Sequence, residues 1–284
     1  MSCGTGNIGR VSAFCYNAMA LDGSVYLPKV VDLARRAGDD IMQVYAEDRI
    51  EASYKDDHSP LTRADMAAHD RIVSELGKMT PQIPVLSEES QTVPYDIRSG
   101  WKMFWLVDPL DGTKEFIKKS ADFTVNIALI DDGVPILGVV HAPALGVTYY
   151  GEVGKGAFKQ TGETPVPIAV AAYHATNLKV VASRSHGSEA LERFLNQIGA
   201  TERVSRGSSL KLCLVAEGAA HLYPRLGPTM EWDTAAGQCV VMAAGGNVTD
   251  LDGVPLRYNK PDLHNPSFMV TGWPAFPWRQ YITP

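Results

Sequence analysis

Residues 105–116 read Trp105-Leu106-Val107-Asp108-Pro109-Leu110-Asp111-Gly112-Thr113-Lys114-Glu115-Phe116. The apolar run that begins at Met103 predicts a buried strand ending at Asp108. Pro109 has no N–H to donate and fixes its φ, so we expect the chain to leave the sheet there, and Asp111-Gly112 turns it back. Asp108 and Asp111 are therefore expected to face one small volume, where a carboxylate pair suits a divalent cation.

The residues after this pair favour an anion beside the cation. The amides of Gly112 and Thr113 open the next predicted helix and point toward the same volume, which suits a phosphate next to a hard cation. An ordinary acidic turn would carry the same D-x-x-D-G letters, so a metal site needs support from further acidic residues.

Two more acidic segments supply that support. Upstream, the short apolar strand Pro84–Leu86 runs into Ser87-Glu88-Glu89-Ser90, which again places carboxylates at a strand end. Downstream, Asp233 precedes a helix of small residues that is predicted to run to about Ala244, where Gly245-Gly246 ends it. Asp233 taken alone would serve equally well as a plain N-cap. Three acidic segments together favour one shared metal site.

Their combination resembles the lithium-sensitive, magnesium-dependent phosphatase superfamily that includes inositol monophosphatase and fructose 1,6-bisphosphatase, from about Val30 to Val270. Within it, four stretches resemble the 3′(2′),5′-bisphosphate nucleotidase branch of the CysQ type: Lys114-Glu115-Phe116, Ser183-Arg184-Ser185-His186, Gly207-Ser208-Ser209-Leu210-Lys211 and Tyr223-Pro224-Arg225-Leu226-Gly227-Pro228. Inositol monophosphatases usually carry Thr-Asn-Phe where Lys114-Glu115-Phe116 stands. The resemblance implies hydrolysis of the 3′-phosphate of adenosine 3′,5′-bisphosphate to AMP and phosphate, with the sulfated relative of this nucleotide as a second substrate.

The resemblance also implies roles for individual residues. Glu88, Asp108 and the carbonyl of Leu110 would hold a first Mg²⁺, and Asp108, Asp111 and Asp233 a second, out of two or three ions. The hydroxyl of Thr113, linked to Asp65, would orient and deprotonate the attacking water. The residues expected to contact substrate are Gly112, Thr113, Lys114, Ser185, His186, Gly207, Ser208, Lys211, Arg225 and Asp233. Of these, Lys211, Arg225, Ser208 and His186 would hold the 5′-phosphate.

Several alternatives stay open on the sequence alone. Glu89 is either an outer partner of the metal site or an exposed neighbour of Glu88. Lys211 on a solvated helix face and Arg225 in a surface loop would be the usual fates of these residue types. The nearest alternative function is an inositol phosphate phosphatase with the same metal chemistry. A more distant one is a non-catalytic metal or nucleotide sensor, which would have no use for a water-activating pair.

Composition limits the class of protein. The chain has 284 residues, enough for a sizeable core, and 26 Lys plus Arg against 32 Asp plus Glu give a net charge of −6. This balance does not suggest nucleic-acid binding through a basic face. The four cysteines show no C-x-x-C spacing, and no apolar run approaches the roughly 18 residues that cross a bilayer. A cytoplasmic protein is expected, with peripheral contact at the inner membrane and the oligomeric state left open.

We predict a leader and two halves. Residues 1–24 are expected to be a disordered leader with Met19 as the natural start, and the single basic residue Arg10 disfavours a signal peptide. Residues 25–162 form a predicted α+β half with the metal motifs, and residues 163–284 a predicted α/β half with the nucleotide-binding residues. The predicted helices are 28–45, 64–78, 189–198, 210–216 and 234–244, and the predicted strands 103–107, 123–130, 134–141, 146–150, 178–182 and 220–223. The strands between 103 and 150 are predicted to form an antiparallel meander. The resemblance implies a layered α-β-α-β-α sandwich with the metal site between the halves.

Overall fold

The structure of the protein is a computed structural model that describes residues 23–48, 50–55, 60–91, 93–173, 177–182, 189–199 and 202–282. The predicted leader up to residue 22 lies outside these ranges, and so does the Ser183–His186 stretch. No helix in the described ranges is long and apolar enough to cross a membrane.

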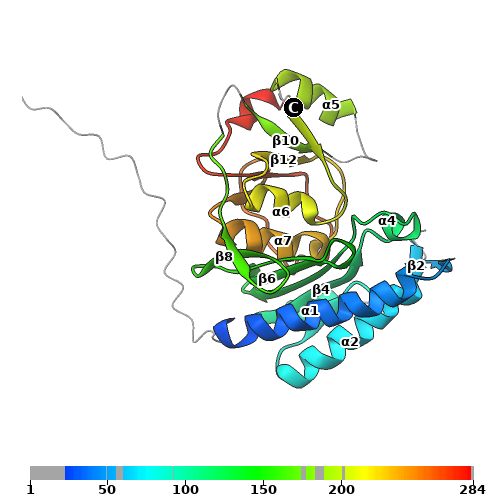
Figure 1. Ribbon diagram of the computed structural model, residues 1–284. Coiled ribbons are helices and arrows are strands. Elements are labelled where there is room, and N and C mark those ends of the chain that lie inside the picture. Colours follow the sequence, from blue (N-terminus) through cyan, green and yellow to red (C-terminus); the bar gives the residue numbers. More distant parts are fainter. Residues whose placement is uncertain are drawn as a thin grey trace, which may run out of the picture.

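Helices and sheets alternate in layers along the molecule (Figure 1). Two helices, α1 (Gly23–Tyr45) and α2 (Arg63–Met79), cover the outer face of a seven-stranded sheet. Two more, α6 (Leu210–Ala216) and α7 (Glu231–Ala243), lie between that sheet and a five-stranded one. The last, α5 (Glu189–Gln197), packs apolar side chains on the far face of the second sheet. The predicted α-β-α-β-α sandwich is confirmed.

The seven-stranded sheet carries the first two acidic segments. Its order is β3 (Val85–Ser87), β4 (Met103–Asp111), β5 (Thr124–Asp131), β6 (Val134–Ala142), β7 (Val147–Glu152), β8 (Gly156–Thr161) and β9 (Pro165–Ile168). From β4 onward every pairing is antiparallel, as the predicted meander requires. The edge strand β3 runs parallel to β4, with Ser87 opposite Val107. Glu88 and Asp108 therefore leave the sheet at the same edge.

The end of β4 differs from the prediction. The strand does not stop at Asp108 but continues through Pro109 to Asp111, and its register shifts between Asp108, opposite Asn126, and Asp111, opposite Thr124. The shift is a bulge, which places one extra residue on β4. A bulge can accommodate a proline because the missing N–H there removes no hydrogen bond between the strands. In a regular strand, residues three apart point to opposite faces. The extra residue puts Asp108 and Asp111 on the same face.

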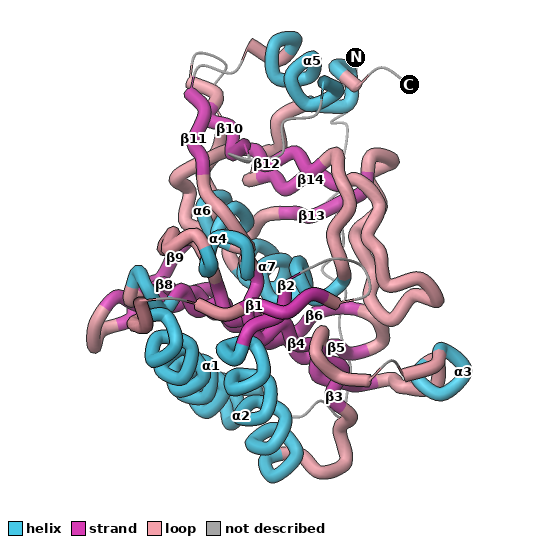
Figure 2. The backbone as a smooth tube through the Cα atoms, turned by 90° about the vertical axis from the view of Figure 1, so that its right-hand side faces the viewer, coloured by secondary structure: helices cyan, strands magenta, loops and turns pink. Residues whose placement is uncertain are grey.

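The five-stranded sheet has the order β11 (Glu202–Ser205), β10 (Lys179–Ala182), β12 (Leu222–Arg225), β14 (Phe268–Thr271) and β13 (Asn247–Asp250), all labelled in Figure 2. The strand predicted at 220–223 is displaced toward its C-terminus, and β11, β13 and β14 were not predicted. Smaller elements are β1 (Ala52–Tyr54), β2 (Pro60–Thr62), α3 (Tyr95–Arg98) and α4 (Thr113–Ile117). The predicted division at residue 162 falls inside the β8–β9 hairpin.

The two outer helices follow the expected pattern with one difference. α1 begins at Gly23, ahead of the predicted start at Pro28, so that Pro28 lies inside the helix. α2 begins where its sequence signal placed it, because Thr62 and Asp65 form the predicted capping box. One stripe on each helix is fully buried against the sheet. These residues are Val30, Ala34, Ala37 and Ile41 on α1, and Ala64, Ala68, Ile72 and Leu76 on α2.

Helix α7 lies against the sheet at backbone contact. A Cβ atom on Gly138 of β6 would come within 2.5 Å of the Ala236 carbonyl oxygen and 2.7 Å of the Cys239 Cβ. Only glycine fits at that position, so the sheet fixes the height of α7 above it. Because Asp233 lies in the first turn of α7, this contact also fixes where the third acidic segment enters the site.

We expect Gly138→Ala to lower the free energy of unfolding by about 1–3 kcal/mol, since the added methyl meets backbone that cannot move aside. Gly77→Ala is the matched control: a Cβ at Gly77 of α2 meets nothing within 4 Å. That substitution should be neutral or stabilising by up to about 1 kcal/mol through helix propensity. Urea unfolding midpoints measure both. Equal midpoints for the two variants would contradict the close contact.

Candidate active site

Four carboxylates from three separate segments interact at the edge of the first sheet. Burial, followed by the charges of Glu88, Asp111 and Asp233, raises the pKa of Asp108 well above its ordinary value. Burial and then the charge of Asp111 raise the pKa of Asp233 in the same way. Asp108 is only 1% exposed. Strand β3, the bulge of β4 and the first turn of α7 therefore bring like charges together in a buried place.

Protein donors hold each of these carboxylates. The N–H of Leu110 donates to Asp108 Oδ1 at 3.0 Å. The N–H of Met230 donates to Asp233 Oδ2 at 2.9 Å. Lys55 Nζ donates to Glu88 Oε1 at 2.8 Å. In the described parts of the chain, no group of three or more His, Cys, Asp and Glu side chains is already arranged around one metal position.

The donor set nevertheless fits a divalent cation. It offers carboxylate and carbonyl oxygens, the ligands that Mg²⁺ prefers. Mutual repulsion and burial both disfavour the ionised forms of Asp108 and Asp233, and a cation between them would relieve both costs.

Lys55 and Glu89 form an outer part of the cluster. Lys55 Nζ lies 2.8 Å from Glu88 Oε1 and 2.6 Å from Glu89 Oε1, and the Glu89 side chain is only 6% exposed. The alternative of Glu89 as an exposed neighbour is therefore wrong. Lys55 follows strand β1, and no local sequence signal pointed to it.

Asp65 holds Thr113 beside the cluster. Asp65 Oδ2 accepts hydrogen bonds from the N–H of Thr62 at 2.7 Å and from its hydroxyl at 2.6 Å. Two acceptors lie within reach of Thr113 Oγ1, Asp65 Oδ1 and the Leu110 carbonyl, each at 3.2 Å. Burial raises the pKa of Asp65, and the bonds from Thr62 oppose that shift. The helix cap and the Thr113 contact thus use different oxygens of one carboxylate.

A cavity of about 140 Å³ adjoins the carboxylates. Its lining combines Asp111 and Asp233 with several predicted substrate residues, namely Gly112, Gly207, Ser208, Lys211 and Arg225. Lys114 is exposed and does not line the cavity, whereas its neighbour Glu115 does. Ser185 and His186 lie outside the described residues.

Two cationic side chains face this cavity. Lys211 is only 8% exposed, so the alternative of a solvated helix residue is wrong, and burial lowers the pKa of its ammonium. Arg225 donates from Nη2 to the Pro228 carbonyl at 2.9 Å, while its buried Nε has no hydrogen-bond partner among the described residues. A buried ammonium and an unpaired guanidinium N–H are suited to an anionic group.

The turn 207–209 connects this cavity to the carboxylates. Asp111 Oδ2 accepts hydrogen bonds from the Ser208 hydroxyl at 2.7 Å, the Ser209 N–H at 2.7 Å and the Ser209 hydroxyl at 2.8 Å. Asn126 Nδ2 donates to Ser209 Oγ at 2.8 Å. Sequence reasoning missed Asn126 and gave Ser209 no role, because each acts on a residue far away in the chain.

Comparison with known proteins agrees with this arrangement. The model of the inositol monophosphatase family matches residues 24–276. The chain belongs to the inositol monophosphatase family. Its relatives include the 3′(2′),5′-bisphosphate nucleotidase CysQ of Salmonella typhimurium, which is 51% identical over 86% of this chain and 99% of its own length. The CysQ of Haemophilus influenzae is 36% identical over 89% of this chain and 95% of its own.

Solved structures place the fold in the same family. The crystal structure of CysQ from Bacteroides thetaiotaomicron superposes with a TM-score of 0.80 and 41% identity, covering 89% of this chain and 99% of that one. The extragenic suppressor protein suhB from Bartonella henselae gives a TM-score of 0.77 at 26% identity, covering 91% and 98%. The predicted CysQ-type branch is confirmed. Enzymes of this family are metal-dependent phosphatases, in general with Mg²⁺.

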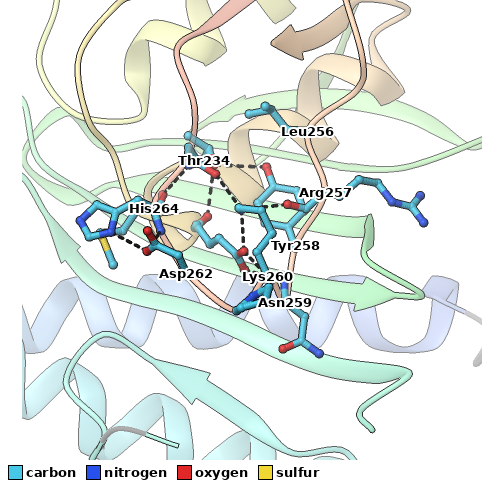
Figure 3. Close-up of polar contacts among 12 residues, drawn as sticks. Thr234, Leu256, Arg257, Tyr258, Asn259, Lys260, Asp262 and His264 are labelled. Atoms are coloured by element: carbon cyan, nitrogen blue, oxygen red, sulfur yellow. Dashed lines mark hydrogen bonds and ion pairs between the residues drawn. The ribbon is translucent and has the colours of Figure 1, made fainter. Parts of the chain in front are cut away.

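In this inositol monophosphatase family member, the loop 256–265 holds the start of α7. Figure 3 shows its side chains around Thr234, with Tyr258 and Lys260 directed toward the helix. The fully buried carboxylate of Glu231 accepts hydrogen bonds from the N–H of Asn259 at 2.6 Å, the N–H of Lys260 at 2.9 Å and Lys260 Nζ at 2.6 Å. Asn265 Nδ2 donates to the Met230 carbonyl at 2.8 Å. The loop thereby fixes the turn from which Asp233 projects.

We expect Lys260→Met to cost about 3–5 kcal/mol of stability, because it leaves the buried Glu231 carboxylate without its counter-charge. The double variant Lys260→Met with Glu231→Gln should recover part of that loss, because it removes the buried charge, although the single amide oxygen can replace the acceptor of only one of the two backbone N–H groups. Urea midpoints measure both, and Lys78→Met at the exposed end of α2 serves as the surface control. A double variant as unstable as the single one would contradict the ion-pair argument.

Proposed function

We propose that this protein hydrolyses the 3′-phosphate of adenosine 3′,5′-bisphosphate, giving AMP and phosphate, and that it acts on the sulfated relative of this nucleotide in the same way. The observation that carries the proposal is one cavity lined both by cluster carboxylates and by cationic side chains. Asp111 and Asp233 line it together with Lys211 and Arg225. A substrate with two phosphates fits this pairing, since one phosphate meets the carboxylate-bound cations and the other meets the basic side chains.

Glu88, Asp108, Asp111, Asp233 and the carbonyl of Leu110 are the proposed ligands of two or three Mg²⁺ ions. Bound there, the ions would supply charge neutralisation, activation of water and stabilisation of the leaving oxygen. Glu89 acts from outside this set through Lys55, which contacts both glutamates.

Asp65 and Thr113 are the proposed pair that positions and deprotonates water. Thr113 Oγ1 carries one proton, and the Asp65 carboxylate is an acceptor for it at 3.2 Å. Asp65 cannot rotate freely, because its other oxygen is bonded to the N–H and hydroxyl of Thr62. The acceptor for the Thr113 proton is therefore held in place, and the lone pairs of Thr113 Oγ1 are available to accept a proton from water.

Lys211 and Arg225 are the proposed charged binding groups for the 5′-phosphate, with Ser208 and Gly207 beside them in the cavity wall. The Lys211 ammonium is desolvated and, among the described residues, donates to the Ser208 carbonyl at 2.7 Å. A phosphate dianion would add a direct charged acceptor for it, and the buried Nε of Arg225, which has no partner among the described residues, offers an N–H. Ser185 and His186 remain predicted contributors on the sequence alone. An inositol monophosphate has no second phosphate for these groups, which favours the nucleotide over that alternative.

We expect kcat/KM for adenosine 3′,5′-bisphosphate to exceed that for inositol 1-phosphate by at least about 100-fold, since unpaired buried charges penalise the wrong substrate. A phosphate-release assay with Mg²⁺ measures both. Chelation by EDTA should abolish the activity and added Mg²⁺ should restore it. A preference for inositol 1-phosphate would overturn the substrate assignment, and turnover after chelation would overturn the metal assignment.

Two substitutions should separate the two parts of the site. Lys211→Met should raise KM for the bisphosphate by about 10–100-fold, the effect of losing one charge-assisted bond, and spare small phosphate monoesters. Asp111→Asn should lower kcat for both substrates by at least about 100-fold, because even outer-shell changes at metal sites cost 10–100-fold. Lys78→Met is the surface control. Parallel losses on both substrates for Lys211→Met would contradict this division.

A further inference from the structure

We propose that Ser209 couples nucleotide binding to cation binding, by joining the Asp111 carboxylate to the turn that lines the substrate cavity. The inference rests on the proposed function, since it takes a nucleotide with a 5′-phosphate as the ligand of that cavity. Ser209 acts through Asp111 and is therefore a positioning residue.

The first step concerns the two oxygens of Asp111. Three donors of the turn lie within hydrogen-bond distance of Oδ2, two of them from Ser209, and Asn126 Nδ2 lies 3.5 Å away. This oxygen is held most firmly while all three donors are directed to it. The described part of the chain gives Oδ1 no donor, so this oxygen is the one available to a cation. The turn thus fixes the orientation in which Asp111 presents its free oxygen.

The second step concerns the single proton of the Ser209 hydroxyl. Two acceptors lie within reach of Ser209 Oγ: Asp111 Oδ2 at 2.8 Å and the Asp233 carbonyl at 2.7 Å. Asn126 Nδ2 donates to the same oxygen at 2.8 Å and occupies one lone pair. The proton can serve only one acceptor at a time, so the hydroxyl has two discrete arrangements. Both acceptors belong to residues of the carboxylate cluster, and an element with two arrangements is what coupling requires.

The third step concerns the cavity side of the turn. Ser208 has a φ of 53°, in the left-handed region that a serine rarely adopts. Lys211 Nζ donates to the Ser208 carbonyl, and the N–H of Gly207 donates to Asp122 Oδ2 at 3.0 Å. A 5′-phosphate held by Lys211 would fix this strained turn from its open side. The donors of the turn then stay on Asp111, and a cation that binds there pays less ordering cost.

The experiment measures binding, not turnover. The dissociation constant of Mg²⁺ or Mn²⁺ is determined by calorimetry with and without saturating 3′-deoxyadenosine 5′-monophosphate, which carries a 5′-phosphate but no 3′-oxygen that could ligate the ion. We expect the nucleotide to strengthen cation binding by about 5-fold or more in the unaltered protein, the lower end of typical couplings. In Ser209→Ala the strengthening should fall to about 2-fold or less, the part that acts through space between charges.

Ser205→Ala is the matched control, because it removes the same hydroxyl in the same segment and the buried Ser205 Oγ has no hydrogen-bond partner among the described residues. It should keep the full coupling. Where circular dichroism shows Ser209→Ala to be unfolded, Asn126→Ala replaces it, since it frees the hydroxyl to rotate and should reduce the coupling in the same way.

The outcomes separate this inference from the proposed function. A protein that fails to bind the nucleotide overturns the proposed function. A protein that binds it and shows the same coupling in the unaltered form and in Ser209→Ala overturns the role of Ser209 and leaves the proposed function standing. Absence of any coupling in the unaltered protein overturns the inference as well.

Discussion

Repulsion among buried carboxylates is the constraint on which the rest of the site depends. Burial raises the pKa of Asp108 and of Asp233, and the charges of neighbouring carboxylates add to the shift, from Glu88, Asp111 and Asp233 on Asp108 and from Asp111 and Glu88 on Asp233. Such a cluster persists only where the surrounding structure determines its position. Two backbone features do so: the bulge in β4 puts Asp108 and Asp111 on one face, and the contact at Gly138 sets the height of α7. These two backbone features therefore hold the carboxylates close together, in an arrangement that a bound cation would stabilise.

Local patterns in the sequence predicted the elements whose signals lie within one segment. The capping box of α2, the meander from β4 to β7 and the helix near Asp233 each have such a signal, and all three form, although the helix begins at Glu231 and so includes Asp233. The prediction that β4 ends at Asp108 was wrong, because a bulge depends on the register between β4 and β5. Pro109 alone does not reveal that register. Strands β11, β13 and β14 have four residues each, too few for a clear period.

The site shows the same division between local and distant signals. Carboxylates at strand ends were visible as residue types in a characteristic order. Their partners were not, because Ser209 lies 98 positions from Asp111, and Lys260 lies 29 positions from Glu231. A serine before an apolar helix has the pattern of an ordinary N-cap, and a lysine in a polar loop that of a solvated residue. Only the tertiary contacts distinguish Ser209 and Lys260 from ordinary capping serines and solvated lysines.

The two halves of the chain meet at Asp111, and this has a consequence for how substrate choice can change within such a fold. Asp111 comes from the half that carries the metal motifs, whereas its three hydrogen-bond donors come from the turn 207–209 beside the cavity. A cavity-wall residue such as Arg225 can differ without removing a hydrogen bond of Asp111, whereas Lys211 also donates to the Ser208 carbonyl of the turn. The turn itself cannot change in this way, because loss of its donors would leave a partly buried carboxylate oxygen without its main partners, at a cost of about 1–3 kcal/mol. Substrate preference is thus free to vary at the cavity wall, while the turn that supports Asp111 must retain its donors.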